Sequence, residues 1–312
     1  MSRIWGIDLY DQNPPVTNWD AMRANGCRFA IFKWSMGFGS SNATWIREQA
    51  AAARAADIIV AGYHWLDPTA PIVAQADRFA RWHDEIQPGF VMLDNEQWWS
   101  DWAKFYAYLR GEITHADIPH FSGGKIAQHV RNVMDRLDAR IDVPKVHYTA
   151  QWFVNGYSRE CSLLMDRWPL ALASYIDRKK VYHAEWDTWH AEQARMTGSP
   201  SLPYGAKSWL LHQYTSTRAW PGRNCNTDVN LFNGDEIDWE NFLNGYVAPP
   251  PVTGTAYKVT AWLGLRVRTG PGTNYSIIRM LKYDTRVVVT ETLDGWGNIG
   301  DGWVSLEWLK EV

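Results

Sequence analysis

The chain has 312 residues, which is enough for one large domain and a small one, because single hydrophobic cores stop growing at about 250 to 300 residues. Its formal net charge of -3 provides no broad basic field, which argues against nucleic acid and anionic membrane surfaces as partners. The three cysteines are far apart and form no C-x-x-C pair, so they indicate neither a disulfide framework nor a thiolate zinc site.

The first residues, MSRIWGIDLYDQ, lack the charged region and the long apolar run of a secretory signal. No later segment reaches the roughly 18 apolar residues that a membrane span requires. We therefore expect a protein without a signal peptide, which stays in the cytoplasm of the cell that makes it and does not insert into a membrane.

Short apolar runs alternate with helical patterns over about the first 245 residues. The short runs are rich in β-branched and aromatic residues, which is typical of strands buried on both faces. Strands are predicted at 3–9, 28–34, 57–65, 90–96, 145–150, 170–176, 208–214 and 227–232. Helices are predicted at 18–26, 44–57, 69–86, 98–110 and 124–140.

This alternation implies a parallel sheet covered by helices, and eight strands in this length predict an α/β fold of the (β/α)₈ barrel type. The helical pattern between residues 177 and 207 is weak, so we expect the second half of the barrel to be irregular. Active sites of such barrels lie at the carboxyl ends of the strands, and polar side chains collect there. They are Asp8, Lys33, Tyr63, Asp94, Glu96, Tyr148, Tyr175 and Gln213, while Asp228 opens the last strand.

The segment YVAPPPVTGTAY breaks this pattern with prolines and small polar residues, which behave as a stiff, partly extended spacer. A PxxP ligand for another domain is the alternative. The spacer divides the chain into a first domain of residues 1–246, a linker of residues 247–256 and a second domain of residues 257–312. The last part combines alternating apolar and polar residues with the tight turns TGPG, DGWGN and GDGW, which predicts a small all-β barrel.

The stretch FVMLDNEQWW, residues 90–99, sets Asp94 and Glu96 at the end of a buried strand. Residues two apart on a strand share a face, about 6.6 Å apart, and two carboxyls that close cannot both ionise freely. A carboxyl that keeps its proton beside a second carboxyl is what general acid catalysis at a glycosidic oxygen needs. Asp8 and Asp228 complete an acidic ring if the first and last strands are neighbours. Alternatively, Asp94 caps a helix and Glu96 is a solvated loop residue.

Other chemistries find little support in the sequence. It contains no H-E-x-x-H, G-x-S-x-G or G-x-x-x-x-G-K-[ST] pattern, which removes the usual zinc protease helix, serine hydrolase elbow and phosphate-binding loop. We therefore expect no metal and no cofactor.

Eight short motifs, in order along the first domain, resemble the landmarks of glycoside hydrolase family 25 lysozymes. The resemblance implies a 1,4-β-N-acetylmuramidase that cleaves the bond between N-acetylmuramic acid and N-acetylglucosamine in peptidoglycan. The motifs are IDLY at 7–10, AIFK at 30–33, GYHW at 62–65, LDNE at 93–96, YT at 148–149, WPLALASY at 168–175, QYTS at 213–216 and DVNLF at 228–232.

The resemblance also implies roles for single residues. Glu96 falls on the family's general acid, Asp94 falls on the partner that orients or polarises the substrate, and Asp8 and Asp228 fall on the outer acids. Whether the second stage uses an enzyme carboxylate or the acetamido oxygen of the sugar stays open at this point. The positions expected to line the groove are Lys33, Tyr63, Tyr148, Tyr175 and Gln213, together with one of the tryptophans that follow the acid, Trp98.

Two features depart from the family pattern. Asn95 stands where the family often has an apolar residue, although this position should point away from the site. The insert 177–207 is longer than expected, and it is either a lid that shapes specificity or a surface excursion, with Trp186 and Trp189 unassigned.

The second domain resembles bacterial SH3 (SH3b) modules through LRVRTGPG at 265–272 and GWV at 302–304. Such modules commonly hold enzymes on the cell wall, and Trp262, Tyr275 and Trp296 are candidate contacts or core residues. Together the two resemblances imply a monomeric endolysin of bacteriophage type, which remains in the bacterial host cytoplasm until lysis and has peptidoglycan as its partner.

Two other functions stay open at this point. A chitinase-like or glucosaminidase-type glycosidase would use a similar barrel, but chitinases typically carry D-x-x-D-x-D-x-E, and Phe90 and Met92 occupy the upstream positions here. The second is a non-catalytic wall-binding protein with a decayed barrel, against which the four intact acids argue.

Overall fold

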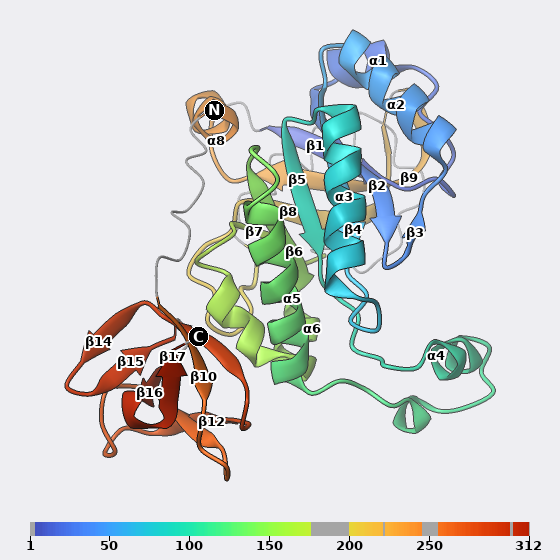
Figure 1. The fold of residues 1–312 in the computed structure, drawn as a ribbon. Coiled ribbons are helices and arrows are strands. Elements are labelled where there is room, and N and C mark those ends of the chain that lie inside the picture. Colours follow the sequence, from blue (N-terminus) through green and yellow to red (C-terminus); the bar gives the residue numbers. More distant parts are fainter. Residues whose placement is uncertain (1–3, 176–199, 221, 245–254, 300–301, 312) are drawn as a thin grey trace. The chain divides into compact units, whose positions relative to one another are not determined.

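The computed structural model describes residues 4–175, 200–220, 222–244, 255–299 and 302–311 (Figure 1). The chain divides into two compact units, Met1–Tyr246 and Val247–Val312. Within the described ranges, no helix is both long enough and apolar enough to cross a membrane. Much of the 177–207 insert, with Trp186 and Trp189, and most of the predicted linker lie outside the described residues.

The described strands of the first unit form an eight-stranded barrel, which confirms the predicted mixed α/β barrel. The sheet order is β1-β9-β8-β7-β6-β5-β4-β2-β3, and β2 pairs back onto β1 to close the cylinder. The short β3 (Gly39–Ser40) only extends the edge of β2. The barrel strands are β1 (Trp5–Leu9), β2 (Cys27–Met36), β4 (Ile59–Trp65), β5 (Phe90–Asp94), β6 (Lys145–Ala150), β7 (Leu170–Ala173), β8 (Leu211–Trp220) and β9 (Arg223–Phe232).

The prediction of a wholly parallel sheet is wrong for β9, which runs antiparallel to both β8 and β1. Both strands are longer than predicted, and only residues 221 and 222 separate them. A parallel connection needs about a dozen residues or more, so the chain can return only as a hairpin. As a result, the first half of β9 lies at the barrel end where the parallel strands finish, and Asp228 pairs with Asp8.

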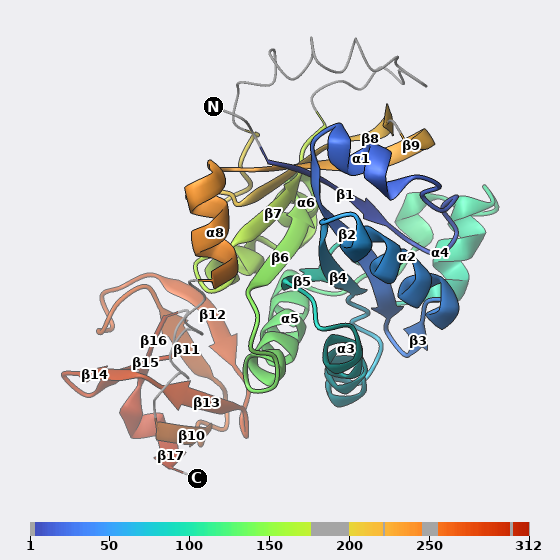
Figure 2. The same cartoon turned by 90° about the horizontal axis from the view of Figure 1, so that it is seen from above.

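Helices cover the outside of the barrel, as the view in Figure 2 shows for α2, α3 and α5. Side-chain caps fix where several begin: Asn42 caps α2, and Ser122 caps α5. The predicted helix at 98–110 begins only at Trp102, because Asp101 accepts a hydrogen bond from the Lys104 N–H and acts as the cap. The helices are α1 (Trp19–Ala24), α2 (Ala43–Ala55), α3 (Ile72–Ile86), α4 (Trp102–Leu109), α5 (Gly123–Asp138), α6 (Gln151–Tyr157) and α8 (Glu236–Asn244), with 3-10 turns η1 (His115–Asp117) and η2 (Arg159–Leu164).

Alternation along each strand separates two cores. On β5, Val91 and Leu93 pack under the helices, whereas Phe90 and Met92 lie inside the barrel. Each fully buried side chain of this kind stabilises the fold by about 1.5 to 3 kcal/mol. Trp239 of α8 stacks on Phe29 with 5.1 Å between ring centroids and fills the end of the interior opposite Asp94. The polar groups therefore collect at the other end.

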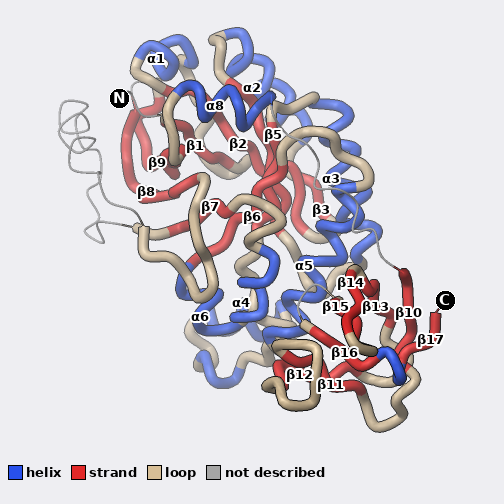
Figure 3. The backbone as a smooth tube through the Cα atoms, turned by 90° about the vertical axis from the view of Figure 1, so that its left-hand side faces the viewer, coloured by secondary structure: helices blue, strands red, loops and turns tan. Residues whose placement is uncertain are grey.

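The second unit is a small all-β structure, as predicted, and Figure 3 shows it as short strands joined by loops, with one short helical turn. One sheet has the order β13-β10-β17 and the other β12-β11-β16-β15-β14. Val259, Val267 and Val304 are fully buried between them. The elements are β10 (Thr255–Val259), β11 (Leu265–Arg268), β12 (Ile277–Leu281), β13 (Arg286–Val289), β14 (Glu291–Leu293), β15 (Trp296–Asn298), β16 (Trp303–Ser305), η3 (Leu306–Trp308) and β17 (Leu309–Glu311).

Candidate active site

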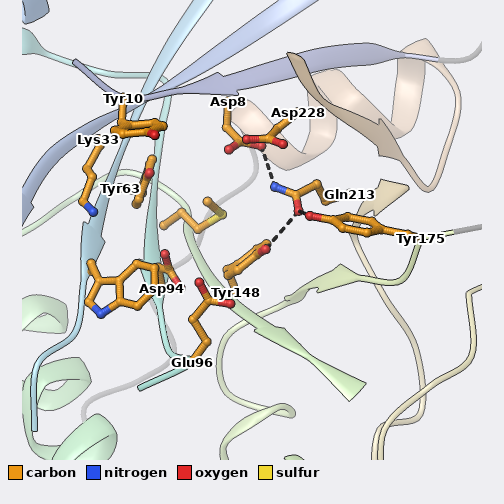
Figure 4. A pocket seen from close by; sticks show the side chains of 12 residues that line it. Asp8, Tyr10, Lys33, Tyr63, Asp94, Glu96, Tyr148, Tyr175, Gln213 and Asp228 are labelled. Atoms are coloured by element: carbon orange, nitrogen blue, oxygen red, sulfur yellow. Dashed lines mark hydrogen bonds between the residues drawn. The ribbon is translucent and has the colours of Figure 1, made fainter. Parts of the chain in front are cut away.

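A cavity of about 360 Å³ lies at the end of the barrel where the parallel strands finish (Figure 4). It brings together the four predicted acids and five of the six predicted groove residues. The lining also contains two aromatic residues that the sequence analysis missed. The complete lining is Asp8, Tyr10, Lys33, Tyr63, Trp65, Met92, Asp94, Glu96, Tyr148, Tyr175, Gln213 and Asp228.

Asp94 and Glu96 form one acidic pair of the cavity. Asp94 is the last residue of β5 and continues the inward alternation of Phe90 and Met92. Glu96 follows two residues later, beyond the strand, and its side chain enters the same cavity. Asn95 between them points away, as expected, with its side-chain N–H₂ directed at the sulfur of Cys161 (3.4 Å).

Burial, together with the charges of neighbouring carboxylates, raises the pKa of both carboxyls in this pair. Burial raises the pKa of Glu96 to about 7, with a further rise from Asp8 and an opposing effect of Lys33. The pKa of Asp94 is raised well above its usual value, first by burial and then by the charge of Glu96. The two carboxyls therefore retain at least one proton near neutral pH, which is the state required of a general acid.

Asp8 and Asp228 form a second acidic pair across the β1–β9 ladder. Oδ2 of Asp8 accepts hydrogen bonds from the side-chain amides of Gln213 (2.8 Å) and Asn230 (2.7 Å). These bonds oppose the effect of burial, which raises the pKa of Asp8. The pKa of Asp228 is raised well above its usual value, first by burial and then by the charge of Asp8, and a side-chain hydrogen bond links the two carboxyls.

Gln213 connects this acidic pair to the aromatic wall. Its Oε1 accepts hydrogen bonds from the hydroxyls of Tyr148 and Tyr175, each 3.0 Å long, which turns its amide N–H₂ toward Asp8. The chain of contacts crosses from β6 through β8 to β1 (Figure 4). Because both hydroxyls are engaged, the ring faces are the parts of these tyrosines that remain for a ligand. Flat aromatic faces suit the C–H faces of sugars.

Lys33 is the one cation in the described lining. Its Nζ lies 4.9 Å from the ring centroid of Trp65 and 5.9 Å from that of Tyr63. Burial lowers the pKa of Lys33, while the charges of Asp94 and Glu96 oppose that effect. In return, the cation lowers the pKa of both acids and limits how strongly they hold protons.

Three residues of this site were missed, although a signal for each existed. Tyr10 follows Asp8, Trp65 follows Tyr63, and Asn230 follows Asp228, each by two positions in or directly after a strand. Residues at that spacing share a face. Applying the alternation beyond the most conspicuous residue of each strand end would have found all three.

The expectation that Trp98 lines the groove is wrong, because the structure buries it (5% exposed) outside the cavity. Its ring stacks on Tyr157 with a centroid distance of 4.8 Å and an interplanar angle of 11°. Trp99 stacks on Phe105 in the same way (3.6 Å, 1°). Once Glu96 points into the cavity, the chain that follows turns outward and these rings fill the space between α4 and α6.

In the described part of the chain, no group of three or more histidine, cysteine, aspartate or glutamate side chains is arranged to hold a metal ion. The side chains that line the cavity supply the following chemistry. One carboxyl titrates near neutral pH, a second lies beside it, a proton-sharing pair lies across the cavity, and aromatic faces surround them. This arrangement can protonate a leaving oxygen and stabilise the positive charge that develops next to it.

A second candidate site lies on the small unit, where a groove of about 700 Å³ includes two of the three predicted contact residues, Trp262 and Trp296. Trp262 is 79% exposed, which is unusual for so large an apolar side chain. Tyr275 does not line the groove, because its ring packs over Gly270, where an added Cβ would lie 2.4 Å from it. The lining is Ala261, Trp262, Leu263, Gly264, Leu265, Arg266, Arg268, Thr273, Met280, Trp296, Ser305, Glu307 and Trp308.

Solved structures share the fold of the first unit. The bacterial lysozyme of Streptomyces coelicolor is 20% identical, with a TM-score of 0.59, and the match covers 79% of this chain and 99% of that one. A muramidase from Acremonium alcalophilum is also 20% identical (TM-score 0.56; 78% and 100% covered). The catalytic domain of endolysin ply40 from bacteriophage P40 of Listeria monocytogenes is 15% identical (TM-score 0.54; 78% and 98%).

Two family models match the chain, one in the first unit and one in the second. The bacterial SH3 domain model matches residues 264–310, which confirms the second resemblance. A search of curated proteins gives no significant match. The model for glycosyl hydrolases family 25 matches residues 7–223, more than half of the chain. The chain therefore belongs to glycosyl hydrolases family 25.

Proposed function

We propose that this protein is a lysozyme, a 1,4-β-N-acetylmuramidase that cleaves peptidoglycan between N-acetylmuramic acid and N-acetylglucosamine. The observation that carries the proposal is the placement of Glu96, with a pKa of about 7, beside Asp94 in the cavity at the barrel end. The family membership narrows the reaction to glycoside hydrolysis, and the muramidases among the similar structures support the choice of bond.

Glu96 is the general acid in this mechanism. It gives its proton to the glycosidic oxygen as the bond from that oxygen to the anomeric carbon breaks, so the leaving sugar departs as a neutral alcohol. Asp94 lies beside it and stabilises the positive charge on the ring, or orients the group that attacks. Water then adds to the anomeric carbon, and its proton returns to Glu96.

Two routes can complete the first step. Either a carboxylate of the enzyme or the acetamido oxygen of the substrate attacks the anomeric carbon, and both retain the anomeric configuration. Asp8, Asp228 and Gln213 line the side of the cavity that faces Asp94 and Glu96, and hydrogen bonds link the three side chains. The sugar rings contact the aromatic faces of Tyr63, Tyr148 and Tyr175. Lys33, which lies close to the indole of Trp65, also contacts them.

The second unit serves as the wall-binding module, joined to the catalytic unit by the linker of residues 247–256. The exposed Trp262 and the groove that it shares with Trp296 provide the contact surface. Tethering raises the local concentration of the catalytic unit at its polymer without changing the chemistry.

The biological setting that fits best is that of a bacteriophage endolysin, a monomer that reaches peptidoglycan when the host membrane is opened. Two of the similar structures are described as endolysins, which supports this setting. Expression in a bacterial host should leave cells intact until the membrane is permeabilised, and then lyse them. Lysis without permeabilisation would contradict the setting but not the enzymatic activity.

Mass spectrometry of digested cell wall tests the reaction itself. New reducing muramic acid ends are the expected product. Reducing glucosamine ends would identify a glucosaminidase instead, and the absence of released fragments would identify a wall-binding protein without activity. The Glu96→Gln variant, which keeps the shape of the side chain, serves as the matched inactive control.

A further inference from the structure

Glu96 lies beyond the end of β5, so the strand pairing of the barrel does not fix its position. β5 ends at Asp94, so the barrel ladder stops two residues before the acid. Yet both neighbours of Glu96 are deeply buried polar residues, Asn95 at 1% and Gln97 at 0% exposure. A buried amide left without partners costs about 1 to 3 kcal/mol, so the contacts of these two residues decide where the turn lies.

Asn95 anchors the turn to β6. Its backbone N–H donates to the carbonyl of Tyr148 (2.9 Å), and its own carbonyl accepts from the hydroxyl of Thr149 (2.8 Å). Its side chain reaches the sulfur of Cys161 on the outside of the barrel. One side of Glu96 is thereby fixed.

Gln97 anchors the other side to the segment that follows β4. Its Nε2 donates to Oδ1 of Asp67 (3.0 Å), and its Oε1 accepts a longer bond from the indole N–H of Trp65 (3.4 Å). Trp65 itself lines the cavity. The turn is therefore held from two different strands.

Asp67 is the centre of this second anchor. It is buried (7% exposed) and does not belong to the cavity lining. Besides Gln97, its Oδ1 accepts from the backbone N–H (2.8 Å) and the hydroxyl (2.6 Å) of Thr69. Its Oδ2 accepts from the indole N–H of Trp102, the first residue of α4 (3.0 Å). Every partner is a donor, as a carboxylate requires.

We propose that Asp67 and Gln97 are positioning residues, which hold the acid Glu96 in the cavity while Asn95 anchors the opposite side of the turn. The inference rests on the proposed role of Glu96. Neither residue needs to touch the substrate, because a displacement of about 1 Å of a catalytic group can lower the rate roughly 100-fold.

The anchored turn also affects the pH dependence of activity. Burial is the largest cause of the raised pKa of Glu96, so a loosened turn that admits water lowers that pKa from about 7. The alkaline limb of the activity profile then moves to lower pH. The other titratable groups that face Glu96 are unchanged: Lys33, Asp8, Asp94, Asp228, Tyr63, Tyr148 and Tyr175.

The test is Asp67→Asn in the full chain, assayed on soluble peptidoglycan fragments. Whichever way its amide turns, its N–H₂ faces at least one donor, that of Trp102 at the Oδ2 position or those of Thr69 and Gln97 at the Oδ1 position, so at least one contact is lost. The kcat should fall roughly 10- to 100-fold with KM within about twofold, and the alkaline limb should shift to lower pH.

The matched control is Asp138→Asn, which changes another carboxylate that accepts from an indole N–H, that of Trp168 (3.0 Å), and from Arg167 (2.9 Å). Asp138 does not line the cavity. This variant should lose stability while it keeps the parental kcat and pH profile.

Asp67→Asn with the kcat and pH profile of Asp138→Asn would overturn the proposal, since both carboxylates would then be only structural. If Asp67→Asn does not fold, Gln97→Met decides by the same readouts, because it removes the amide at similar length. Retained activity in Glu96→Gln would instead refute the assignment of the acid. An inactive Glu96→Gln with a normal Asp67→Asn would refute the positioning role alone.

Discussion

The Glu96→Gln substitution tests the chemistry and the electrostatics of the cavity together. Glutamine keeps the shape of the side chain but has no proton to transfer. Turnover on soluble peptidoglycan fragments should fall at least about 100-fold, since a general acid commonly contributes about 10²- to 10⁴-fold. Binding to cell walls should stay at the parental level, because the second unit is unchanged.

The same variant should also change stability, in a direction that depends on pH. The pKa of Glu96 rises from 4.5 to about 7 on folding, a difference of about 2.5 units, which corresponds to roughly 3 kcal/mol. Below about pH 4.5 the carboxyl is protonated in both the folded and the unfolded state, so it does not lower the free energy of unfolding. Between pH 4.5 and 7 the carboxyl ionises in the unfolded state first, so stability falls as pH rises. Above pH 7 the whole loss of roughly 3 kcal/mol is present.

Because glutamine carries no charge, the free energy of unfolding of Glu96→Gln should be about 3 kcal/mol larger than that of the parent near pH 8 and equal to it near pH 4. For a domain of this size the gain corresponds to about 6 to 12 °C in Tm. Thermal unfolding at both pH values, followed by circular dichroism, measures it. Glu48→Gln, at an exposed position on α2, is the control and should change neither Tm nor turnover.

Two outcomes refute the reasoning. A Tm difference that is the same at both pH values would show that ionisation of Glu96 in the cavity does not destabilise the folded protein. Activity above about a tenth of the parental value would show that Glu96 is not the acid.

Four further changes probe other parts of the structure. Lys33→Met removes the cation that lowers the pKa of Glu96, so the alkaline limb of kcat/KM should move to higher pH, and an unmoved limb contradicts the assigned role of Lys33. Trp262→Ala should weaken sedimentation with cell walls while turnover on soluble fragments stays parental; deletion of residues 249–312 should do the same more strongly, and equal loss of both activities would mean that the module does more than anchor. Trp98→Phe keeps an aromatic stack on Tyr157 and should leave KM within about twofold, whereas a tenfold rise would return Trp98 to the site.

Local patterns in the sequence predicted much of the barrel. The β-branched and aromatic runs marked each barrel strand, and the spacing of two residues predicted that Asp94 and Glu96 project on the same side. Caps such as Asn42 and Ser122 explain why helices begin near the predicted positions. These features depend on residues within a few positions of one another, so a single sequence contains them.

The direction of β9 could not be predicted in this way. The residues between the predicted seventh and eighth strands resembled a connection, but the structure uses nearly all of them to lengthen β8 and β9. Similarly, nothing near Trp98 in the sequence reveals that its ring stacks on Tyr157 outside the cavity. Both outcomes depend on partners that only the closed barrel supplies.

The sequence by itself determined that carboxylates, tyrosines and a lysine stand at the ends of buried strands. Only the tertiary structure decided which of them meet: Asp8 with Asp228 and Asn230, Gln213 with two tyrosines, and Gln97 with Asp67. The physical reason is that strand periodicity fixes the face on which a side chain lies. Its neighbours across the barrel depend instead on how residues up to 222 positions apart come together when the cylinder closes.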